Sequence, residues 1–212
     1  MKKLNHKILL AGVFLFFGVI LSACNSSHLI SIWKEPEVRP SSLKSFFVIC
    51  VNNNNSKRRQ WEDAIAHTLN SRGVKASPSY KYFPKDVPDS SDLSSFLGNK
   101  FDAVLMIHKV NEEMRKYRTP GYAAVYPIGG FRNHFYRNYA RIYHEVYIPG
   151  RIEQEKVYQL ETTIYEPRED GRLIWSAVTE TADPRSTKDF TDEVLGIIIP
   201  KLTSDGILPG RN

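Results

Sequence analysis

The residue with the clearest chemical role in this sequence is Cys24, because of what precedes it. Leu21–Ala23 leads directly into this cysteine, a pattern typical of a site where a secretory signal is cut and the new N-terminal cysteine is lipidated. Upstream lie a basic start, Met1–Lys7, and an uncharged apolar run, Ile8–Leu21, too short to cross a bilayer comfortably as a helix. We therefore predict a signal peptide over residues 1–23 and lipidation of Cys24. The alternative is a membrane anchor that stays attached, and the abrupt change to polar sequence after Cys24 counts against it.

The remaining side chains show no catalytic or metal-binding pattern. No histidine pair has the close spacing of a metal motif such as HExxH, no GxSxG nucleophile sequence occurs, and Gly129-Gly130 lacks the context of a phosphate-binding loop. His134 and His144 could meet across a hairpin, but two imidazoles without a placed carboxylate make a weak site. We expect no catalytic residue, no metal and no cofactor, and keep a hydrolase as a less favoured alternative.

The second cysteine, Cys50, is predicted to be structural. If lipid occupies Cys24, Cys50 stands alone among the two cysteines of the chain and no internal disulfide can form. It lies in the apolar run Ser45–Val51, which is typical of a buried strand, where a thiol behaves as a small apolar side chain.

The length and net charge of the chain are those expected of one ordinary domain. Removal of residues 1–23 leaves 189 of the 212 residues, enough for a single core, and takes three lysines away from the formal charge of +6, which leaves +3. A surface this mildly basic does not favour a nucleic-acid partner. The one basic run, Lys57–Arg59, stands where a helix should begin, and we interpret it as a solvated helix end.

An aromatic-rich insertion at about 112–138 is the unusual part of the chain. It mixes tyrosine and phenylalanine with glycine and arginine, and Tyr and Arg are enriched at protein interfaces. We predict that it binds an envelope protein partner through Tyr122, Tyr126, Phe131, Phe135 and Tyr136. Two alternatives stay open: the aromatic rings bind a small ligand or a glycan such as peptidoglycan, or they only close a sparse core.

The periodicities predict a mixed α/β sheet with a β-α-β opening, a C-terminal β-hairpin and a final helix, with the helices mainly on one face. Residues 24–43 should form a lipidated, largely extended tether whose apolar group, Ile30, Ile32 and Trp33, docks on the domain formed by residues 44–212. Strands are expected at about 46–51, 74–80, 101–110, 139–148, 158–165 and 172–180, and helices at 57–71, 90–97 and 187–202, the last kinked or ended early by Pro200.

Several short motifs also resemble a known family. They are Trp33–Pro36, Gly73–Ala76, Phe101–Val104, Glu161–Tyr165, Leu173–Trp175 and Asp183-Pro184. In this order they resemble an uncharacterised family of bacterial lipoproteins of unknown function, whose domain is similar to the N-terminal domain of the TolB translocation protein and to curli-secretion lipoproteins. The family supplies no catalytic residues.

The N-terminus itself resembles that of bacterial lipoproteins, which carry a diacylglyceryl group and usually a further acyl chain such as palmitate. Two or more chains hold a protein stably on a membrane. Asn25, in the place where an aspartate favours inner-membrane retention, implies the outer membrane, on its periplasmic side. The resemblance thus implies a non-enzymatic component of the cell envelope.

Overall fold

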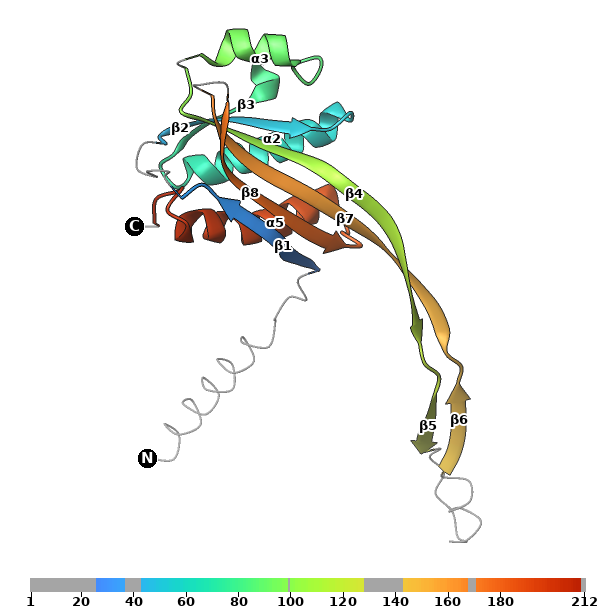
Figure 1. Ribbon diagram of the computed structural model, residues 1–212. Coiled ribbons are helices and arrows are strands. Elements are labelled where there is room, and N and C mark those ends of the chain that lie inside the picture. The colour runs from blue at the N-terminus through green and yellow to red at the C-terminus, as the bar shows by residue number, and fades with distance from the viewer. Residues whose placement is uncertain (1–25, 37–42, 99, 128–142, 168–170, 211–212) are drawn as a thin grey trace, which may run out of the picture.

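The computed structural model describes residues 26–36, 43–98, 100–127, 143–167 and 171–210, which form a six-stranded sheet, helices packed against it, and a separate strand pair (Figure 1). The strand order is β1-β8-β7-β4-β2-β3; β2 runs parallel to β3 and β4, and the other pairings are antiparallel. The strands of the sheet are β1 Ser27–Lys34, β2 Ser45–Val51, β3 Lys75–Pro78, β4 Ala103–Thr119, β7 Arg151–Glu166 and β8 Arg172–Ala182. The predicted fold class is confirmed.

The β-α-β opening consists of β2, helix α2 (Asn55–Asn70) and β3, followed by a short 3-10 helix, η2 (Ser79–Lys81). The Asn54 side chain caps α2 by accepting a hydrogen bond from the Lys57 backbone N–H at 3.0 Å, two residues before Ser56, the N-cap expected from the sequence. Gly73, at φ +77°, supplies the left-handed residue that turns the chain into β3.

Two apolar cores lie on opposite faces of the sheet. The larger one packs α2 and the final helix α5 (Thr187–Ser204) against the sheet, with Trp175 fully buried at its centre. The smaller one packs α3 (Ser90–Leu97) over β2 and β4, around Phe47 and Phe101. Figure 1 shows α3 on its own side of the sheet, while α2 and α5 share the other side.

Helix α5 continues through Pro200 to Ser204, so of the two effects expected of Pro200, a kink or an early end, the early end does not occur. A proline lacks the N–H that would bond the carbonyl four residues earlier, here that of Gly196. Because Pro200 and Gly196 are both exposed, that carbonyl can face water, while Ile198, Ile199 and Leu202 hold the other side of the helix in the core.

The segment expected to be a docked tether contains an edge strand. β1 pairs with β8 from Ser27↔Thr181 to Lys34↔Trp175. The Ser27 hydroxyl lies 2.6 Å from that of Thr181 and donates to Glu193 of α5 at 2.7 Å. The apolar group therefore meets the domain by backbone pairing, and Ile30 and Trp33 are left 47% and 45% exposed.

Strands β4 and β7 are much longer than the sequence indicated. β4 pairs with β2 only as far as His108, and β7 pairs with β8 only from Val157, yet the two strands stay paired with each other out to Thr119 and Arg151. Beyond them β5 (Tyr122–Pro127) pairs with β6 (Tyr143–Ile148). We call residues 109–127 and 143–156 the hairpin arm, and Figure 1 shows it projecting far beyond the sheet.

The described part of the aromatic-rich insertion, for which no secondary structure was predicted, consists of strands of the hairpin arm. Residues 112–119 and 122–127 are strand, and 128–138 lie outside the described residues. The two strand pairs meet at Gly121 and Gly150, where a Cβ on Gly121 would lie 2.8 Å from the Gly150 backbone nitrogen. Only glycine allows this approach of the two backbones.

Candidate functional site

The predicted site residues fall on or beyond the hairpin arm. Tyr122 begins β5 and is 58% exposed. Tyr126 lies in the same strand, opposite His144, and nothing further is described of its side chain. Cys24, Phe131, Phe135 and Tyr136 lie outside the described residues, so their assigned roles stay predictions.

The described surface of the hairpin arm carries large apolar side chains in water. Five of them are half exposed or nearly so: Met114 55%, Tyr117 46%, Tyr122 58%, Tyr147 68% and Ile152 69%. Met114 lies opposite Lys156 and Ile152 opposite Arg118, which places Met114 and Ile152 on one face, while Tyr117 belongs to the other. Neither face of the arm is covered by a core.

The edges of the hairpin arm are also unpaired. Among the described strands, none pairs with the outer side of β4 after His108 or of β7 before Val157, and β5 and β6 pair only with each other. Such edges present a row of backbone donors and acceptors that another chain can pair with. An isolated two-stranded hairpin is at best marginally stable in water.

On the face of the sheet that α3 covers, an ion pair joins the base of the hairpin arm to β8. The Arg115 guanidinium donates to both carboxylate oxygens of Glu180 at 2.8 and 3.1 Å, and also to Glu113. Gln159 adds a further hydrogen bond to Glu180 at 2.9 Å. The Arg115 and Gln159 hydrogen bonds hold the pKa of Glu180 down at about 2, and the same carboxylates raise the pKa of Arg115.

A second ionic cluster lies on the opposite face of the arm base. Glu112 accepts from Lys109 and, at 2.5 Å, from Lys156, and these two hydrogen bonds lower the pKa of Glu112 to about 2. The Lys156 ammonium also stands 5.2 Å from the centre of the Tyr158 ring. Two cations therefore meet one carboxylate here, which leaves an excess of positive charge.

Beside this cluster the domain contains a cavity of about 660 Å³. It lies where parallel strands β2 and β4 end their shared pairing, between the first turns of α2 and α5 and the base of the arm. Open α/β sheets commonly bind ligands at such a carboxyl edge. The residues that line the cavity include Asn52, Asn54, Lys57, Trp61, Lys109, Glu112, Lys156, Tyr158, Ser186, Thr187 and Phe190.

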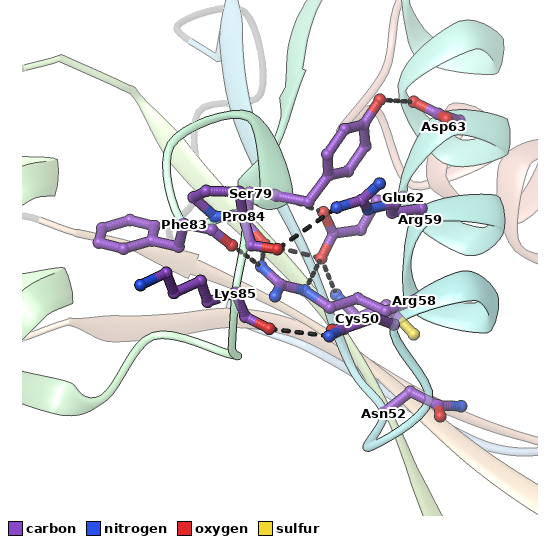
Figure 2. A network of polar contacts seen from close by, with 12 residues as sticks. Cys50, Asn52, Arg58, Arg59, Glu62, Asp63, Ser79, Phe83, Pro84 and Lys85 are labelled. Atoms are coloured by element: carbon purple, nitrogen blue, oxygen red, sulfur yellow. Dashed lines mark hydrogen bonds and ion pairs between the residues drawn. The ribbon is translucent and has the colours of Figure 1, made fainter.

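A buried polar network fixes the start of α2 beside this cavity (Figure 2). Arg58 and Glu62, which are 1% and 0% exposed, form an ion pair at 3.1 Å. Glu62 also accepts from the Ser79 hydroxyl and the Cys50 and Tyr80 backbone N–H groups, while Arg58 donates to Ser79 and the Phe83 carbonyl. The prediction of a wholly solvated helix end was therefore wrong for Arg58, which ties α2 to the loop after η2.

A serine, a carboxylate and a histidine lie together in the described sheet, but their order is not that of a catalytic triad. Ser176 donates to Glu161 at 2.8 Å, and His108 Nε2 lies 3.4 Å from the same carboxylate. The carboxylate therefore lies between the serine and the histidine, whereas in a catalytic triad the histidine lies between the serine and the carboxylate and acts as the base. Burial raises the pKa of Cys50 to about 12, which suppresses the nucleophilic thiolate. The described residues contain no cluster of three potential metal ligands, and none of their helices is long and apolar enough to span a membrane.

Comparison with known proteins gives weak structural likenesses only. A PelC dodecamer from Paraburkholderia phytofirmans aligns with a TM-score of 0.43 at 12% identity, over 84% of this chain and 96% of that chain. Lipoprotein GNA1162 from Neisseria meningitidis aligns with a TM-score of 0.38 at 10% identity, over 76% of this chain and 98% of that chain. No protein-family model and no curated protein matches the sequence. These likenesses include a lipoprotein but transfer no role to any residue, and the resemblance to TolB and curli-secretion lipoproteins stays a prediction.

Proposed function

We propose that this protein is a lipid-anchored, non-enzymatic component of the bacterial cell envelope that binds another envelope protein through its hairpin arm. The observation that carries this proposal is the arm itself. Two strands leave the sheet, keep unpaired edges and expose Met114, Tyr117 and Ile152 to water on both faces. A partner that covers these side chains would supply the burial that the isolated arm lacks.

The anchor would hold the base of the arm near the membrane. Strand β1 begins at Ser27, so the chain between a lipidated Cys24 and the sheet spans about 10 Å at most. Ser27 and Tyr158 both pair with Thr181 of β8, from opposite sides, which places Tyr158 about 10 Å from Ser27 across two strand spacings. The partner would therefore be a protein in or at the same membrane, for which Asn25 favours the outer one.

A charge substitution at two exposed tyrosines tests the proposal. The lipidated protein, purified from gently solubilised membranes, should bring a partner with it in constant proportion. The double variant Tyr122→Asp/Tyr147→Asp should lose this partner, because two carboxylates would have to be desolvated in the interface. Since both side chains are exposed, the free energy of unfolding should change by less than about 1 kcal/mol.

The matched control is Ile30→Asp/Trp33→Asp, which places the same two charges at exposed strand positions outside the arm. It should keep the partner at the wild-type proportion. Undiminished recovery of the partner by the double tyrosine variant would refute binding through the arm.

A further inference from the structure

The cavity at the base of the arm has an excess of positive charge. Lys57, Lys109 and Lys156 line it, and Glu112 is the only carboxylate among its lining residues. Glu112 is already engaged by Lys109 and Lys156, while Lys57 has no carboxylate partner within the part of the chain that the structure describes. An anion entering the cavity would meet cations that Glu112 only partly neutralises.

The uncharged lining combines aromatic rings with hydrogen-bond donors. Phe190 meets Trp61 edge to face with ring centres 5.3 Å apart and lies tilted against Tyr158 at 5.4 Å. Because Trp61 is only 4% exposed, Phe190 and Tyr158 supply the open part of this aromatic surface, with Trp61 supporting Phe190 from behind. Asn52 and Asn54 use their side-chain oxygens to accept backbone N–H groups. Their carboxamide NH₂ groups have no partner among the described residues and can donate to a ligand. Stacking surface with planar amide donors suits a sugar ring.

The volume of the cavity fits a small molecule. About 660 Å³ lies within the range of small-ligand pockets, whose walls combine apolar surface with a few placed polar groups. The Thr187 hydroxyl at the start of α5 and the three lysines are such groups, whereas the Ser186 hydroxyl is engaged with Asp189 as the N-cap of this helix.

We propose that this cavity binds an acidic sugar, a sugar ring that bears a carboxylate or a phosphate. The ring lies against Tyr158 and Phe190, and the anionic group lies between Lys57 and Lys109. The site does not depend on the hairpin arm binding a protein, because its side chains belong to the domain and the arm base.

Two matched ligand pairs test this proposal on the purified lipidated protein in detergent. N-acetylmuramic acid against N-acetylglucosamine and glucose 6-phosphate against glucose each compare an acid with its neutral counterpart, and ligand-observed NMR titration gives each Kd. At least one acid should bind saturably, at least about tenfold tighter than its neutral counterpart, since a charge-assisted hydrogen bond is worth about that factor. Tighter binding of N-acetylmuramic acid alone would identify a carboxylate as the anionic group, and tighter binding of glucose 6-phosphate alone would identify a phosphate.

Variants assign the binding to the cavity. Lys57→Gln and Lys109→Gln should each weaken acid binding about tenfold. Lys75→Gln makes the same charge change at an exposed position on β3, outside the cavity lining, and should leave the Kd unchanged. Equal binding of acid and neutral sugar, no saturable binding of either acid, or equal effects of Lys57→Gln and Lys75→Gln would each overturn the proposal. The variant Tyr122→Asp/Tyr147→Asp should still bind the acid, which separates this site from the protein-binding role of the arm.

Discussion

Removal of the buried carboxylate of Glu62 should destabilise the domain more than any surface charge change. Its carboxylate, 0% exposed, accepts hydrogen bonds from the side chains of Arg58 and Ser79 and from the backbone N–H groups of Cys50 and Tyr80. In Glu62→Ala these donors lose their acceptor, and Arg58, itself 1% exposed, becomes an unpaired buried cation.

Breaking a buried ion pair from one side costs about 3–5 kcal/mol. Because a domain has about 5–15 kcal/mol of total stability, Glu62→Ala should lose a large part of it. For a chain of this size the corresponding fall in Tm is about 6–20 °C. Urea unfolding followed by far-ultraviolet circular dichroism measures the free energy of unfolding.

The neighbouring carboxylate supplies the control. Asp63 is exposed and accepts only the Tyr80 hydroxyl at 2.7 Å, so Asp63→Ala should cost less than about 1 kcal/mol. Adding Arg58→Met to Glu62→Ala should recover part of the loss, because the orphaned guanidinium is then gone. If Glu62→Ala cost no more than Asp63→Ala, or if the second substitution deepened the loss, the account of this network would be refuted.

Three further outcomes concern Glu180 and the two cysteines. Hydrogen bonds from Arg115 and Gln159 lower the pKa of Glu180 from 4.5 to about 2, so its carboxylate stabilises the folded state fully above about pH 4.5 and progressively less as the pH falls towards 2. Glu180→Gln should therefore reduce the fall of the urea midpoint with pH in this window. An unchanged slope of the midpoint against pH would contradict this contribution. Cys50, 5% exposed and with its pKa raised to about 12, should resist alkylation by iodoacetamide at pH 8 in the folded protein and react in urea; rapid labelling of the folded protein would show that the thiol is accessible. Cys24→Ser should move the protein from the membrane fraction to the soluble fraction, whereas Cys50→Ser should leave it in the membrane fraction; membrane retention of Cys24→Ser would favour an uncleaved anchor.

The sequence predicted the elements that bury apolar side chains in the cores. Helix α3 was placed at its observed bounds, and β2, β8 and α2 within about two residues. Burial of one face gives α2 a regular apolar period, while burial of both faces gives β2 an unbroken apolar run. The edge strand β1 was missed because its apolar residues stay largely exposed, so its pairing with β8 leaves little apolar pattern.

The outer part of β4 was missed for a related reason. From Lys109 to Arg118 every residue is exposed, so both faces carry mixed polar and apolar side chains and no alternation marks the strand. The cavity is not readable from the sequence either. Its lysines, 57, 109 and 156, are far apart in the chain and meet only through the order of β2, β4 and β7. The aromatic composition of residues 112–138 did indicate an unusual segment.

Site-specific photo-crosslinking in living cells tests the central claim most directly. A photoreactive residue replaces Tyr122 or Tyr147 on the hairpin arm of the lipidated protein and, as the control, Ile30 on β1. The account predicts one discrete heavier species from each arm position and none of that mass from position 30. Mass spectrometry then identifies the partner, with an adduct of twice the chain mass indicating assembly with a second copy. No adduct at either arm position, with the protein correctly anchored, would contradict binding through the arm.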